Sequence, residues 1–492
     1  MKTSMGEIAR PQPTRLYRWM VLLFISIAMG GNYYIYDSIN PLERIFIDKL
    51  GYSATGFGWL NSSYSAAAIL TLLIGGIIID RIGTKKAIAF FAVVCLTGAA
   101  LTALRGQLWV MVVGRTVLGL GAESMIVAVT TALAKWFKGK ELSFAFGINL
   151  LIARLASVAA DNSPTWANRA FYPQGPAGEP SWQGPLLIAA GAGVMAVVCS
   201  LVYWALESRA EARYQLAEAG SIDRIEFGPM FRIRGLSFRQ AVLQIWRALR
   251  EMFGFNPSYW LVVGLCFTFY SAIFPFRTFA IDLFTNKILG AHSEITASEA
   301  IKQAGFCNSL LPFTAMIATP LFGLMVDRVG KRALFMMLGS VLIMPVYLMM
   351  AYLSAARTVT FTFPWVTAWH LTLEHITVPL LLLVTMFMMG IAFSLIPAVM
   401  WPSVAYIVDQ SRLGTAYALM TLIQQVGFFL LNLIIGKAND FSHAGPDNPG
   451  GYALGMWIFS ILGFVGLTFA ILLRKRETGL EGHGLETIRA AG

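Results

Sequence analysis

Roughly twelve apolar segments of about 20 residues run along this chain, and a segment of that length is what a helix needs to cross the hydrocarbon of a bilayer. Apolar residues make up 57% of the 492 positions and charged residues only 13%, which excludes an ordinary soluble domain of this length. We therefore expect an all-α membrane protein with twelve transmembrane helices. The predicted spans are 17–37, 57–79, 87–105, 108–134, 142–162, 184–206, 258–280, 303–326, 332–354, 376–406, 412–436 and 451–473.

One motif occurs twice, each time at the end of an apolar segment. Residues 76–83 and 323–330 both read Gly-x-x-x-Asp-Arg-x-Gly, and a basic pair follows each copy closely. The two halves also align elsewhere, with Gly390 falling on Gly119 and Leu413 on Leu142. A membrane protein built twice is almost always a carrier, and the repeat predicts two pseudo-symmetric six-helix bundles.

The repeat also sets the expected domain boundaries. We expect one bundle in residues 1–206, a cytoplasmic linker in 207–257 and a second bundle in 258–492. The linker contains an amphipathic piece, Phe238 to Phe253, that we expect to lie on the inner leaflet. A polar and aromatic run, 355–374, is extra chain in the second half and should project outside.

The charged pairs in the repeated motif are candidates for a gate. An acid and a base at the end of a helix can pair with neighbouring helix ends in one conformation and release them in another. We therefore assign gating to Asp80, Arg81, Asp327 and Arg328, and expect these contacts to break when the site opens inward.

Most of the 37 lysines and arginines fall in alternate loops that are continuous with both chain ends. Basic loops stay on the cytoplasmic side, so we expect both termini inside. The tail 1–15 has no acidic dileucine sorting signal and the outer loops have no obvious glycosylation acceptor, so we expect a multi-pass protein of the cytoplasmic membrane. The net charge of +11 then needs only anionic lipid, not nucleic acid. The four cysteines lie in or beside apolar spans and read as core residues, and we expect no metal and no cofactor.

Two opposite charges fall near the middle of consecutive spans. Glu123 lies about 18 Å from the cytoplasmic edge, measured along a helix from Lys135, and Arg154 lies about 21 Å from the same edge, measured from Lys140. Ionisable groups at this depth are expensive and usually face a cavity or a partner. The pair forms a structural salt bridge, a site for a substrate that carries both an amine and a carboxylate, or each of these in alternation.

Other polar residues inside the spans are weaker candidates. Arg115 shares a helix with Glu123 and could contact substrate, although helix packing or a proton relay with Glu123 explains it at least as well. Asp37 and Asp161 fall near the outer ends of their spans and are expected to be extracellular gate residues, with solvated loop acids as the alternative.

The second half supplies a base, aromatic rings and amides. Arg277 follows Pro275, which we expect to break its helix, and either binds an anionic group or extends to the outer surface. The remaining candidates for substrate contact, with core packing as the alternative, are Tyr270, Trp401, Gln424, Gln425 and Asn432.

The repeated motif resembles the loop motif of the major facilitator superfamily, and Gly-Arg-x-x-x-Gly at 114–119 resembles its helix-four motif. Residues 114–124, 136–142 and 401–408 look more narrowly like the lysosomal dipeptide transporter branch, major facilitator superfamily domain-containing protein 1. This resemblance implies the major facilitator fold and passive or weakly coupled transport of dipeptides by rocker-switch alternating access, as in a uniporter.

Two other functions remain open at this point. A proton-coupled carrier of mono- or dicarboxylates could use Arg154, Arg277 and Arg115 as a cationic cage with Glu123 as its proton site. A non-transporting metabolite receptor could use the same fold. An enzyme is not expected, because the sequence lacks the usual nucleophile, phosphate-binding and metal-ligand motifs. The expected partners are a small-molecule substrate and the bilayer; a monomer suffices, and the sequence assigns no accessory subunit.

Overall fold

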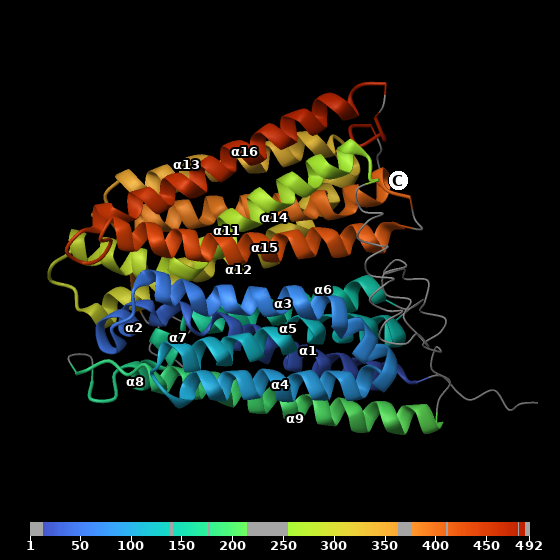
Figure 1. Ribbon diagram of the computed structural model, residues 1–492, viewed down its shortest axis with the longest axis horizontal. Helices are drawn as coiled ribbons and strands as arrows, with labels where there is room; N and C mark the ends of the chain where they lie inside the picture. Colours follow the sequence, from blue (N-terminus) through green and yellow to red (C-terminus); the bar gives the residue numbers. More distant parts are fainter. Residues whose placement is uncertain are drawn as a thin grey trace, which may run out of the picture.

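The computed structural model describes residues 13–137, 141–175, 178–213, 254–362, 375–409, 412–480 and 482–487. Twelve long helices in these ranges form two bundles of six (Figure 1). The N-terminal bundle consists of α1 (Arg15–Asp37), α3 (Ala54–Ile82), α4 (Thr84–Leu104), α5 (Leu108–Phe137), α6 (Leu142–Asp161) and α9 (Gln183–Arg213). The C-terminal bundle consists of α11 (Pro257–Ala291), α12 (Ala297–Val329), α13 (Arg332–Tyr352), α14 (Leu380–Ile407), α15 (Leu413–Phe441) and α16 (Ala453–Glu477).

The helices run in parallel and antiparallel directions along one axis, so the molecule has two end faces (Figure 1). We call the face where α1 begins and α16 ends the chain-end face, and the opposite one the far face. Short elements cover the far face: η1 (Asn40–Leu42), α2 (Glu43–Leu50), α7 (Ser163–Trp166), α8 (Asn168–Phe171), the hairpin of β1 (Thr358–Thr362) and β2 (His375–Pro379), and η6 (Pro449–Tyr452).

The predicted membrane class agrees with the helices observed. By length and composition, eleven helical segments of the described residues could cross a membrane. The remaining long helix, α3, has 29 residues, and some of its side chains lie outside the described set. An unbroken helix suits such an environment because it satisfies its backbone hydrogen bonds internally.

Three sequence expectations need correction. The tenth span begins at Leu380 rather than 376, because residues 375–379 pair with β1 as a strand. Helix α11 runs continuously through Pro275 instead of breaking there; the packing of neighbouring helices tolerates a proline inside a membrane helix. Helix α9 extends to Arg213, so its last polar turns belong to the N-terminal bundle rather than to a linker. The predicted amphipathic piece, 238–253, lies outside the described residues.

Gly83 and Gly330, the last residues of the two motif copies, each end a helix with a positive φ, 80° and 72° respectively. Residues with a side chain rarely adopt this conformation, so the turn needs glycine at that point. In both bundles the repeated motif thus ends in a tight helix-to-helix turn that depends on glycine, at the chain-end face.

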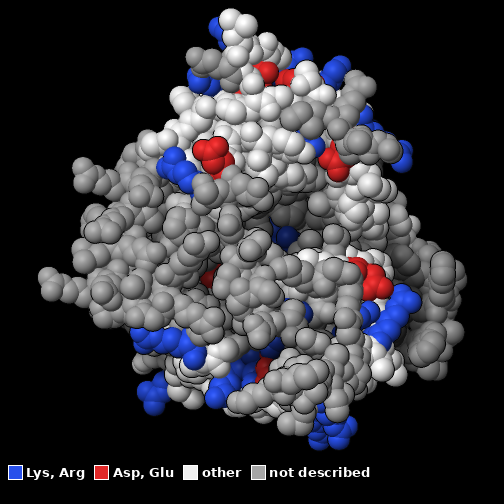
Figure 2. Space-filling model, turned by 90° about the vertical axis from the view of Figure 1, so that its right-hand side faces the viewer, with Lys and Arg blue, Asp and Glu red and all other residues white. Residues whose placement is uncertain are grey.

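The bundles meet along two helix pairs, α3 with α15 and α6 with α12. Gly58 allows a close approach in the first pair, since a Cβ there would overlap the backbone oxygen of Asn432. The hydrogen bonds found between the bundles, among described residues, lie between the midplane and the far face. The chain-end face is hollowed at its centre, with Lys and Arg side chains around the margin (Figure 2).

Candidate functional site

Glu123 occupies the middle of α5 and is half-buried. Its Oε1 accepts hydrogen bonds from the Tyr64 hydroxyl and from Nε2 of Gln425, both at 3.1 Å. Its Oε2 is not buried and makes no hydrogen bond with any described residue. A carboxylate held by two neutral donors, with one oxygen free, can accept a cationic group.

Arg154 on α6 is half-buried and forms no hydrogen bond or ion pair with a residue in the described ranges. Its guanidinium lies over the rings of Tyr33 and Phe393, at 5.9 and 5.5 Å from their centroids. The structural salt bridge between Glu123 and Arg154 is therefore wrong for this conformation. A guanidinium inside a membrane protein without an anionic partner is the arrangement expected of an empty anion site.

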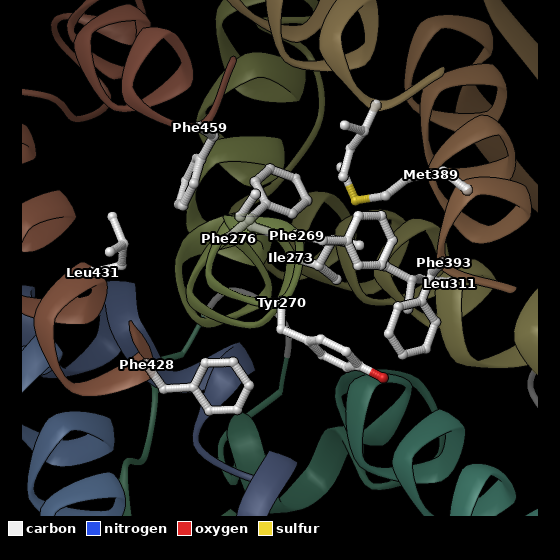
Figure 3. Close-up of a cluster of buried hydrophobic side chains, with 14 of the residues drawn as sticks. Phe269, Tyr270, Ile273, Phe276, Leu311, Met389, Phe393, Phe428, Leu431 and Phe459 are labelled. Atoms are coloured by element: carbon white, nitrogen blue, oxygen red, sulfur yellow. The ribbon is translucent and has the colours of Figure 1, made fainter. Parts of the chain in front are cut away.

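Aromatic side chains of the C-terminal bundle form one wall of this region. Nε1 of Trp401 donates to the Tyr270 hydroxyl at 2.9 Å, and Tyr417 donates to the backbone oxygen of Trp401. Tyr270 and Phe428 lie on the side of α11 that faces the N-terminal bundle, whereas Phe276 lies on the other side (Figure 3). We call Glu123, Arg154 and this wall the central site.

The three predicted amide side chains differ in position. Gln425 is buried and reaches across the bundle interface to Glu123. Gln424 is half-buried and makes no hydrogen bond with the described residues. Asn432 donates to the backbone oxygen of Phe428 and lies at the close approach of α3 and α15, so it serves packing in this conformation.

Arg277 neither faces the central site nor extends to the surface. Its guanidinium donates to Asp161 at 2.8 Å and to Asp37 at 3.3 Å, and all three side chains are at most 4% exposed. Asn308 adds a hydrogen bond to Asp161 at 2.9 Å. These four residues, the Arg277 cluster, join the bundles on the far side. The expectation that Arg277 contacts substrate is not met in this conformation, because two carboxylates already bind its two terminal nitrogens.

Arg115 is buried, and its two terminal nitrogens are held by the N-terminal bundle, while its Nε has no partner. It donates to the backbone oxygens of Ile35 and Tyr36, at 3.3 and 3.2 Å, and to the Asn61 side chain. Asn61 in turn donates to Thr278 of the other bundle at 2.9 Å. Arg115 therefore holds the end of α1 against the interface, which supports the packing interpretation rather than a proton relay.

The predicted gate residues of the repeated motif, unlike the Arg277 cluster, make no contact between the bundles among the described side chains. The Asp80 side chain lies outside the described set, and Arg81 and Arg328 are exposed. Asp327 pairs with Arg332 of its own bundle at 3.0 Å, and Arg332 lies over the Tyr406 ring. In this conformation the second motif stabilises one bundle internally.

Sequence reasoning missed Glu207, which organises the chain-end side of the N-terminal bundle. Its carboxylate accepts from Lys135 at 2.8 Å, Trp136 at 3.0 Å and Thr84 at 3.1 Å, and from the Tyr203 hydroxyl. The available signal was an acid directly after an apolar span. Tyr64 and Asn308 gave no signal, because a tyrosine or asparagine in a span resembles a core residue.

Comparison with known proteins agrees with this architecture. Among curated relatives, the lysosomal dipeptide transporter MFSD1 of Danio rerio is 29% identical over 430 residues, covering 86% of this chain and 81% of the relative. The same transporter of Homo sapiens is 28% identical over 434 residues, covering 87% and 81%.

Solved structures share the fold at low identity. The nucleoside transporter NupG superposes with a TM-score of 0.64 at 13% identity, covering 93% of this chain and 99% of the other. A bacterial homolog of the human lysosomal transporter Spinster, inward-facing and occupied, has a TM-score of 0.65 at 15% identity, covering 94% and 98%. The model of the Major Facilitator Superfamily matches residues 22–361 and 278–487. The chain is a multi-pass membrane carrier and belongs to the Major Facilitator Superfamily.

Proposed function

We propose that this carrier moves dipeptides, with Glu123 binding the substrate amine and Arg154 its carboxylate. The observation that carries the proposal is the state of Arg154, which has aromatic neighbours and no anionic partner in the described chain. The free Oε2 of Glu123 supplies the complementary charge. The curated relatives with the dipeptide transporter name support this substrate class.

Gln425 gives the empty carrier a substitute for the substrate amine. Its Nε2 reaches Glu123 from the opposite bundle, so the two bundles stay joined at the central site without ligand. An arriving ammonium group replaces this neutral hydrogen bond with a charge-assisted one, which is stronger. This contact would let the empty carrier return and so supports net transport rather than obligatory exchange.

We also propose a direction for the conformation described. The far side is closed by hydrogen bonds between the bundles, and the chain-end face is hollowed (Figure 2). If basic loops lie in the cytoplasm, the chain-end face is cytoplasmic and this conformation opens inward. Asp37, Asp161 and Arg277 then act as the external gate, and the membrane is the cytoplasmic one with both termini inside.

The organic-anion alternative uses Arg154 and Arg277 as a cationic cage, with Arg115 as an optional third member. Two of them are already occupied, since Arg277 binds two carboxylates and Arg115 binds backbone and amide oxygens. Both are also buried. The geometry therefore favours a substrate with one carboxylate and one amine.

Thermal stabilisation of the purified protein tests the assignment, because a ligand that binds the folded state raises its melting temperature. The panel contains a dipeptide, its N-acetylated and C-amidated forms, and simple carboxylates. We expect the unmodified dipeptide to stabilise the protein most, and Glu123→Gln and Arg154→Gln to remove the effect. Two variants at exposed side chains, Glu299→Gln and Arg169→Gln, serve as separate controls. Stabilisation by carboxylates alone that survives Glu123→Gln would overturn the assignment.

A further inference from the structure

Glu43 is a buried acid without partners at the interface of the bundles. It is the first residue of α2, its side chain is 1% exposed, and neither carboxylate oxygen has a hydrogen-bond partner. The adjacent base does not neutralise it, since Nε of Arg44 lies 3.0 Å from both oxygens of Asp48. A charged carboxylate in such a place is strongly unfavourable, whereas a protonated one is not.

A second buried acid faces it from the C-terminal bundle. Asp282 on α11 is 3% exposed; one of its oxygens accepts from the Tyr452 hydroxyl, and the other has no partner. The charged neighbours of Glu43 are Asp282, Asp440 and Arg44, and those of Asp282 include Arg44 and Asp48. Acids therefore outnumber bases around both carboxyl groups.

An unsatisfied amide beside them independently indicates a missing donor. Asn286 is fully buried, and its Nδ2 donates to the Tyr452 hydroxyl at 2.6 Å. Its Oδ1 has no hydrogen-bond partner. A carboxylic O–H in this cluster would supply the donor that the amide oxygen lacks. Within the described residues, no group of three His, Cys, Asp or Glu side chains is placed to hold a metal ion.

We infer that Glu43 and Asp282 form a proton-binding site that closes the far side of the carrier. The two acids belong to different bundles, so closing the far face brings both into one dry interface and opening it separates and hydrates them. The closed form must therefore bind more protons than the open form. A lower pH on the far side favours closure, independently of any substrate.

Distances across the far face test the site without a transport assay. Lys49 and Asp447 are exposed and lie in different bundles, so spin labels can replace them in a background without the four buried native cysteines. We expect the distance distribution to shift from long to short as the pH falls from about 8.5 to about 5.5, because the closed form binds more protons than the open form.

Neutral isosteres separate a proton from other occupants. Glu43→Gln and Asp282→Asn imitate the protonated form, so each should favour the short distance and lose most of the pH response. Glu299→Gln, which neutralises an exposed acid in the first turn of α12 and outside this set of charged neighbours, should retain the response. A wild-type distribution that does not change with pH, or an unchanged response in both neutral variants, would overturn the inference. A response to sodium instead of pH would assign the site to a monovalent cation and overturn the proton assignment.

Discussion

Replacing Arg277 with methionine should open the far side of the carrier. The substitution leaves Asp37 and Asp161, which are 2% and 0% exposed, without their shared cation in the closed conformation. Removing one partner of a buried ion pair costs about 3–5 kcal/mol. We expect a free-energy cost at the lower end of this range, because Asp161 keeps its hydrogen bond from Asn308. When the far side opens, water solvates both acids and this cost disappears.

A difference of about 3 kcal/mol corresponds to a population shift on the order of 10²-fold, at 1.4 kcal/mol for each factor of ten. Spin labels at Lys49 and Asp447 report it as a growing long-distance population. Adding Asp37→Asn and Asp161→Asn to Arg277→Met removes the unpaired charges and should restore the short distance. Arg169→Met, at an exposed arginine on the same face, is the matched control. An unchanged distance distribution in Arg277→Met, or an equal change in the control, would show that the Arg277 cluster does not hold the far side closed.

Three further predictions follow from individual contacts. Gln425→Leu removes the neutral partner of Glu123, so uptake into empty proteoliposomes should fall several-fold while exchange against internal dipeptide continues; equal loss of both would contradict the proposed role. Gly58→Ala should weaken far-side closure because its Cβ would meet a backbone oxygen of α15, whereas Gly147→Ala should be neutral because nothing lies within 4 Å; accessibility of a far-side cysteine measures this. Glu207→Gln should lower the melting temperature by several degrees through loss of a buried charged hydrogen-bond acceptor, and an unchanged melting temperature would show that the cluster contributes little.

The sequence predicted the membrane class, the two halves and the helix positions because these depend on local composition and period. Asp37 and Asp161 were also placed near the outer helix ends, and their gating role remains a prediction. The boundary errors had local causes that composition does not show. Residues 375–379 are apolar enough for a span but pair as a strand, and the last turns of α9 are polar but pack on the N-terminal bundle.

The contacts between the halves could not be read from one sequence. The partner of Arg277 depends on which helix ends meet across the interface, and both acids lie in the other half of the chain. Glu123 and Arg154 were predicted from their depth in the membrane alone. In the structure they do not pair, because Gln425 binds Glu123 and the Arg154 guanidinium lies over the Phe393 ring. These contacts depend on the conformation of the carrier. Glu43 was missed because an acid outside an apolar span looks solvated.

Uptake of a radiolabelled dipeptide into proteoliposomes tests the central claim most directly. We expect the wild type to take up the dipeptide. Unlabelled dipeptide should inhibit this uptake strongly, and its N-acetylated and C-amidated forms only weakly. Glu123→Gln and Arg154→Gln should each abolish uptake. Equal inhibition by the blocked forms, or uptake that survives both substitutions, would contradict a site in which Glu123 binds the amine and Arg154 the carboxylate.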